Sequence, residues 1–103
     1  MITLKEAYFI AKRKSEYSRL NRCNDAGDCW TFGFVSGDYD PTDWKSNLLE
    51  EHGGGGILTV DKDTGRLWEY FPARDGFDIL GRQKAVSVAE LTKYDAEFEA
   101  EYA

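Results

Sequence analysis

The sequence has few of the residues from which enzyme active sites are usually built. His52 is its only histidine, and no nucleophile motif of the GxSxG kind is present. A lone loop histidine without a paired nucleophile seldom acts as a general base. Acyl or phosphoryl transfer therefore has no support, and we expect a protein that is not an enzyme.

Long apolar runs and a secretory leader are also missing. No stretch approaches the ~18–20 apolar residues that are needed to cross a bilayer. The N-terminal sequence MITLKEAYFIAKRK carries charges inside its apolar stretch and no small-residue cleavage site, which indicates a folded helix and not a signal peptide. We expect a cytoplasmic protein without a membrane partner.

Cysteine is scarce, and the only two, Cys23 and Cys29, lie six residues apart. That spacing permits a disulfide, but a reducing cytosol favours free thiols. Zinc sites want four ligands, and His52 is the only histidine that the chain offers. We expect no metal and no cofactor, and we leave the disulfide open.

Two glycine-containing motifs resemble ligand-binding loops but lack their context. Gly53 to Gly56 precede a predicted strand, whereas a phosphate loop follows a strand and opens a helix. In the stretch 61–65, DKDTG, the glycine comes one place too early for a calcium loop, and Pro72 stands where the last acid is needed. We interpret the first motif as the lead into a strand and the second as a turn.

The negative charge of the chain is distributed unevenly. Residues 1–22 hold six Lys or Arg against two Glu, and the rest of the chain holds seven basic against 17 acidic residues, for a net charge of −6. Such an acidic body repels nucleic acid and attracts a protein with a basic cleft. The alternative is that the charge serves only solubility.

The N-terminal and C-terminal segments both show helical patterns. Thr3 and Glu6 fit a capping box, and a stripe of mostly small residues follows to a helix end predicted near Leu20. Ser87 and Glu90 repeat the capping pattern before the final segment. An amphipathic C-terminal helix is predicted there from the helical spacing of Leu91, Tyr94, Phe98 and Tyr102.

The middle of the chain predicts strands. Trp30, Phe32 and Phe34 alternate onto one face of a strand at 29–35, and further strands are expected at 57–61 and 66–71 around a hairpin turn that ends at Gly65. A loop is expected at 72–76, and a fourth strand is possible near 84–86. On the strand at 66–71, Glu69 favours Trp68 and Tyr70 as the inward pair. We predict one α+β domain over residues 1–103. An N-terminal helix packs on a three- or four-stranded antiparallel sheet, with the amphipathic C-terminal helix beside it.

Residues 36–56 form a long polar stretch between the first two predicted strands. It is rich in Asp and Gly, and Lys45–Glu51 is predicted as a brief helix or an extended segment. A loop of this length in a small domain is usually functional or mobile.

The order of these features resembles the YrhB-like family, also named immunity protein 35. Its members are small bacterial α+β proteins, many of them encoded beside polymorphic toxins. The matching residues are Trp30-Thr31-Phe32 and the run from Gly55 to Gly65, GGILTVDKDTG, and the resemblance spans roughly residues 3–72. It implies a protein that binds a cognate bacterial toxin and occludes its active site.

An acidic surface and a long loop with aromatic side chains suit that role. The predicted toxin-binding residues are Asp38, Tyr39, Asp40, Asp43, Trp44, Glu50, Glu51 and His52. We expect a monomer or a weak homodimer. One alternative is a regulatory domain that assembles with itself through its sheet face and Leu91, Tyr94 and Phe98. The other is a small metal-dependent hydrolase that uses His52 and the Asp cluster.

Overall fold

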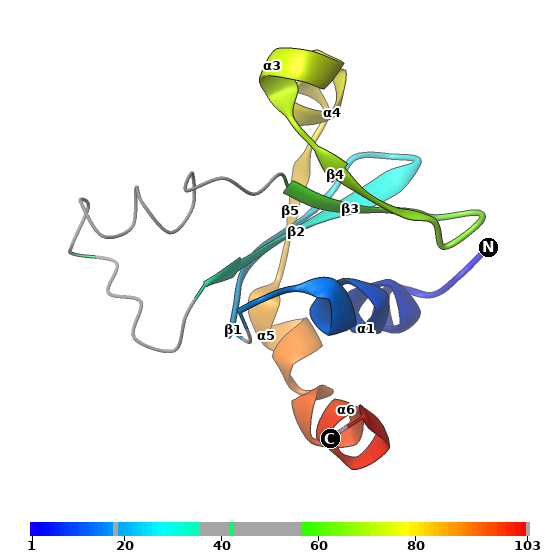
Figure 1. The fold of residues 1–103 in the computed structure, drawn as a ribbon, viewed down its shortest axis with the longest axis vertical. Coiled ribbons are helices and arrows are strands. Elements are labelled where there is room, and N and C mark those ends of the chain that lie inside the picture. The colour runs from blue at the N-terminus through cyan, green and yellow to red at the C-terminus, as the bar shows by residue number, and fades with distance from the viewer. Residues whose placement is uncertain (18, 36–41, 43–56, 103) are drawn as a thin grey trace.

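The computed structural model describes residues 1–17, 19–35, 42 and 57–102. The helices and strands are α1 (Leu4–Lys14), β1 (Arg19–Asp25), β2 (Cys29–Val35), β3 (Ile57–Asp61), β4 (Leu67–Tyr70), α3 (Pro72–Asp75), α4 (Asp78–Gly81), β5 (Lys84–Val86), α5 (Val88–Thr92) and α6 (Asp95–Tyr102). The strands form one antiparallel sheet in the order β4-β3-β2-β1-β5. Figure 1 shows α1, α5 and α6 on one side of it and α3 and α4 on the other. The predicted α+β class is confirmed, with five strands instead of three or four.

Helix α1 begins as its sequence predicts. The Thr3 hydroxyl accepts from the Glu6 backbone N–H at 3.1 Å, and the Glu6 carboxylate accepts from the Thr3 backbone N–H at 3.2 Å. The stripe of mostly small residues on one face of α1 lets the helix lie close to the sheet. Ala7, Tyr8 and Ala11 are fully buried there. The helix ends at Lys14, however, and not near Leu20.

Strand β1 occupies the residues that were predicted as the last turn of that helix and the turn after it. Leu20 and Cys23 are its two buried side chains, a spacing of three that is typical of a helix. The spacing arises because the register with β2 shifts between Leu20 and Arg22 at a bulge, so that one extra residue enters the alternation. A pattern-based prediction does not detect a strand whose alternation is broken in this way.

The face of the sheet toward α1 holds the main core. Phe32 and Phe34 are buried against Tyr8, with ring centroids 6.3 and 6.1 Å from its ring, so the predicted role of the aromatic strand is confirmed. Their cross-strand partners Leu58 and Leu20 join the same cluster. Complete burial of each such side chain contributes about 1.5–3 kcal/mol.

The side chains that are buried on the opposite face of the sheet are partly polar. Thr31 and Thr59 are buried there, and Gln83 Nε2 donates to Thr31 Oγ1 at 3.1 Å. Tyr70 is also buried, and its hydroxyl donates to the carbonyl of Gly76, which ties the α3–α4 segment to the sheet. The predicted inward role of Tyr70 is confirmed, but on the face away from α1, while Trp68 beside it is only half-buried.

The hairpin between β3 and β4 forms as predicted. The Asp61 carboxylate accepts from the backbone N–H groups of Asp63 and Thr64, both at 2.9 Å. Gly65 follows at φ 74°, a left-handed conformation that costs glycine little. These backbone hydrogen bonds, that from Thr64 first, hold the pKa of Asp61 below its usual range.

The C-terminal third differs from its prediction in three details. Residues 72–75 form the short helix α3 where a loop was expected, with Pro72 in its first turn. Ser87 precedes α5 but makes no side-chain capping bond, so the second predicted capping box is wrong. The predicted single C-terminal helix is divided into α5 and α6. None of the helices in the described part of the chain has the length and apolar character to cross a membrane.

Candidate protein-binding surfaces

The residues predicted from the sequence to contact a partner lie outside the described part of the chain. They are Asp38, Tyr39, Asp40, Asp43, Trp44, Glu50, Glu51 and His52. Their roles, and the predicted brief helix at 45–51, stay predictions.

The structure does fix the two points between which this stretch runs. β2 and β3 are antiparallel neighbours, with Phe32 opposite Leu58, so Val35 and Ile57 lie at the same end of the sheet. Residues 36–56 contain five acidic side chains and one lysine, which is a net charge of −4 out of the −6 of the whole chain. Most of the uncompensated negative charge therefore belongs to a segment attached at one end of a packed sheet.

The basic N-terminal helix meets the acidic C-terminal helix. Lys5 Nζ lies 2.8 Å from Glu97 Oε1, and Lys12 Nζ lies 3.2 Å from Asp95 Oδ1. The buried Tyr8 hydroxyl donates to the same Asp95 oxygen at 2.5 Å. Part of the charge asymmetry of the sequence is thus satisfied by ion pairs between α1 and α6.

Contacts with aromatic rings reinforce the junction between α1 and α6. The rings of Phe9 and Phe98 meet edge to face at 5.2 Å, and the Arg13 guanidinium lies 4.7 Å from the Tyr102 ring. Leu91 is 1% exposed, and Tyr94 packs partly buried against the same core. The side chains that were considered as a self-assembly surface are therefore engaged within the chain.

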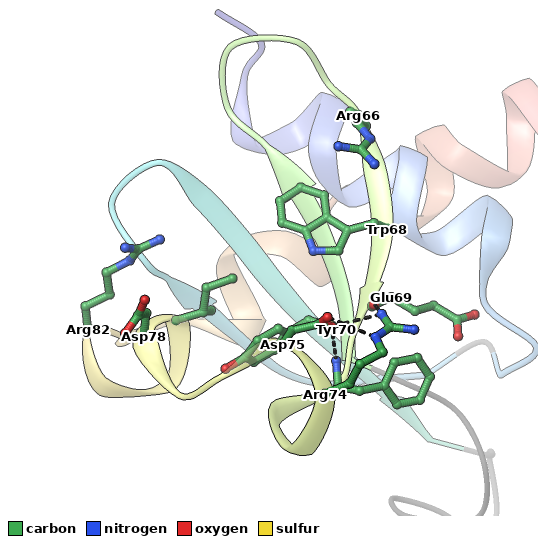
Figure 2. A pocket seen from close by; sticks show the side chains of 10 residues that line it. Arg66, Trp68, Glu69, Tyr70, Arg74, Asp75, Asp78 and Arg82 are labelled. Atoms are coloured by element: carbon green, nitrogen blue, oxygen red, sulfur yellow. Dashed lines mark hydrogen bonds and ion pairs between the residues drawn. The ribbon is translucent and has the colours of Figure 1, made fainter.

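A pocket of about 670 Å³ opens on the face of the sheet away from α1. Trp68 and Tyr70 of β4 form one wall, and Arg74, Ile79 and Arg82 approach from the α3–α4 segment (Figure 2). The Tyr70–Gly76 hydrogen bond ties that segment to the sheet beside the pocket. The pocket lies beside a strand edge and is lined by aromatic, cationic and acidic side chains.

Three of the six charged residues that line this pocket, Arg74, Asp75 and Arg82, form ion pairs. Arg74 forms a bidentate pair with Asp75, through Nε and Nη2 at 2.9 Å each, and this pair holds the pKa of Asp75 below its usual range. Arg82 Nη2 lies 2.8 Å from Asp28 Oδ1. Arg66 differs, because it is exposed and forms no ion pair within 4.0 Å among the described residues, although its charge is one of those that lower the pKa of Asp61.

The thiols are buried and poorly reactive. Burial raises the pKa of Cys23 to about 12 and that of Cys29 to about 11, so at neutral pH neither is a nucleophilic thiolate. Both cysteines are free; Cys23 packs in the core on the α1 side, and Cys29 belongs to the opposite set of side chains on its strand. Among the residues that the structure describes, no three His, Cys, Asp or Glu side chains gather as a metal site.

The sequence matches no family model, and comparisons with curated proteins and with solved structures give no significant match.

The pocket was not predicted from the sequence. Its walls come from β4 and from residues 72–82, which were expected to form a loop and a short turn. Pro72 was the one local signal, because proline is favoured in the first turn of a helix. The position of α3 over β4 depends on the buried Tyr70 hydroxyl, which residue patterns do not show.

Proposed function

We propose that this protein is an immunity protein that binds a bacterial protein toxin and occludes its active site without catalysing a reaction. The proposal combines the family resemblance of residues 3–72 with the location of the charge. The carrying observation is that Lys5 and Lys12 of α1 are paired with acidic side chains of α6, while residues 36–56 hold a net charge of −4.

An acidic segment of this kind suits a basic partner. Complementary charge accelerates association, because it steers the two surfaces together before they touch. Tyr39 and Trp44 supply aromatic side chains of the type that anchors protein interfaces. Asp38, Asp40, Asp43, Glu50, Glu51 and His52 complete the proposed surface.

The described core suits a binding role better than a catalytic one. The raised pKa values of Cys23 and Cys29 leave neither thiol ready as a nucleophile at neutral pH, and the pKa values of Asp25, Asp61 and Asp75 are lowered by neighbouring lysines, arginines and backbone N–H groups. A rigid sheet that presents a charged segment is a common arrangement for binding.

The test is co-expression of this chain with the protein encoded by the adjacent reading frame. We expect that protein to arrest growth alone, and we expect this chain to restore growth and to co-purify with it as a complex. The matched variant is Asp40→Lys with Glu51→Lys, whose rescue should be weaker than that of Glu99→Lys with Glu101→Lys. An adjacent product that is harmless, or that is not bound by this chain, contradicts the proposal.

A further inference from the structure

Strand β4 is an edge of the sheet with open backbone groups. The Asp61 N–H donates to the Arg66 carbonyl at 2.9 Å, and β3 pairs with β4 in register from there. Because antiparallel pairs alternate, Trp68 and Tyr70 bond to β3, whereas Leu67 and Glu69 direct their N–H and C=O groups outward. The Arg74 Nη2 that donates to the outward Glu69 carbonyl at 3.1 Å supports this assignment.

The edge is only lightly protected. Natural sheets block their edges with short strands, charges or covering segments. Strand β5 at the other edge has three residues, and Lys84 lies on it. On β4, in the described structure, only the Glu69 carbonyl has a partner on the outward side. The outward groups of Leu67 and the N–H of Glu69 are therefore available to another strand.

The pocket lies beside this edge, on the Trp68 face. A strand added to β4 would run about 4.8 Å from it, with alternate side chains directed to that face. One such side chain would lie against Trp68 and the pocket, whose lining side chains are drawn in Figure 2. Backbone pairing along an edge with a pocket for alternate side chains is a recurring mode of peptide recognition.

Arg66 indicates which kind of side chain an added strand would place beside it. Its guanidinium lies 5.8 Å from the Trp68 ring, at the β4 end of the pocket wall. Arg74 and Arg82 each lie within ion-pair distance of a carboxylate, whereas Arg66 interacts with Asp61 only through a longer-range electrostatic effect and forms no ion pair within 4.0 Å in the described part of the chain. A carboxylate from an added strand can pair with it in bidentate geometry.

We propose that β4 and the adjoining pocket bind an extended peptide segment of a partner protein by strand addition, with an acidic side chain of that segment paired to Arg66. This proposal uses none of residues 36–56, so its failure leaves the toxin-binding proposal intact.

The test uses a phage-displayed library of random nonapeptides selected on the full chain, followed by dissociation constants of the recovered peptides. We expect peptides with Asp or Glu at one fixed position. Glu69→Pro removes an outward N–H that β3 does not use, and proline is tolerated on strand edges. It should weaken binding at least tenfold, whereas the matched Glu69→Ala should change it less than threefold. Arg66→Ala should weaken acidic peptides and leave their Gln counterparts unchanged.

A second measurement needs no variant. In the wild-type chain, peptide binding should slow hydrogen exchange at the amides of Leu67 and Glu69, while those of Trp68 and Tyr70 are slow with or without peptide. The proposal is overturned if no peptide is enriched, if Glu69→Pro binds as well as Glu69→Ala, or if exchange at Leu67 and Glu69 is unchanged. It is also overturned if β4 pairs instead with a second copy of the chain, seen as a dimer that Glu69→Pro dissociates.

Discussion

Asp95 is the residue whose removal should most clearly separate α6 from the rest of the molecule. Its Oδ1 accepts from the Tyr8 hydroxyl at 2.5 Å and from Lys12 Nζ at 3.2 Å. Tyr8 is fully buried and the Lys12 side chain is 9% exposed, so Asp95→Ala leaves a buried hydroxyl and a nearly buried ammonium without this carboxylate. Removing a hydrogen-bond partner of a buried polar group costs about 1–3 kcal/mol.

The lysine keeps favourable contacts after the substitution. Lys12 Nζ lies 5.6 Å from the Tyr8 ring and 5.2 Å from the Phe98 ring, so its full penalty does not apply. We expect Asp95→Ala to lower the free energy of unfolding by about 2–3 kcal/mol in total. The control is Glu97→Ala, which removes an exposed ion pair with Lys5 and should cost about 0.2–1 kcal/mol.

Urea unfolding followed by circular dichroism measures both changes. With an m-value of about 1.5 kcal/mol/M, the midpoint should fall by about 1.3–2 M for Asp95→Ala and by less than about 0.7 M for Glu97→Ala. Equal shifts for the two variants would refute the reasoning, because they would mean that the Tyr8–Asp95–Lys12 network contributes no more than a surface pair.

Three further outcomes follow from the same structure. Burial and then the Asp95 hydrogen bond raise the pKa of Tyr8 above its usual value of about 10. The protonated Tyr8 hydroxyl therefore contributes stability that is fully present below pH ~10 and is lost as pH rises through the folded pKa. Above pH ~10 the urea midpoint should fall more steeply for the wild type than for Tyr8→Phe. Parallel curves for the two proteins would contradict this. In a thiol assay with an aromatic disulfide at pH 8, Cys23 and Cys29 should react slowly in the native chain and rapidly in urea, and fast native labelling would show that they are accessible. Gly65→Ala should lower stability by about 1–2 kcal/mol because of its φ of 74°, while Gly81→Ala, which meets no neighbouring atom and has no such φ, should not.

The parts of the fold that the sequence predicts are those determined by local chemistry. The capping box at Thr3, the left-handed glycine at Gly65 and the alternation of Trp30, Phe32 and Phe34 each specify their own conformation. Neighbouring residues suffice for these elements, because a turn or a cap is decided within four or five positions.

The missed elements depend on distant partners. β1 is a strand because β2 and β5 pair with it on both sides, and the bulge between Leu20 and Arg22 hides it behind a helical spacing. The division of the C-terminal segment likewise places Asp95 beside Tyr8 and Lys12, residues of α1 that lie more than 80 positions away in the sequence. Tertiary contacts of this kind override local propensity.

Of the two candidate binding regions, residues 36–56 and the β4 edge, only the first can be recognised from the sequence. The acidic character of residues 36–56 is a matter of composition, and it is visible without coordinates. The β4 edge and its pocket need the strand order, the outward direction of Leu67 and Glu69 and the position of α3. No residue pattern supplies these three facts.

The most direct test of toxin binding through the acidic segment is the association rate with the product of the adjacent reading frame, measured by stopped flow from low to high salt. Asp40→Lys with Glu51→Lys should slow association by about tenfold at low salt and converge with the wild type at high salt. Glu99→Lys with Glu101→Lys changes the net charge equally but on α6, and it should slow association much less. Equal slowing by both pairs, or none by either, would show that residues 36–56 do not meet the toxin.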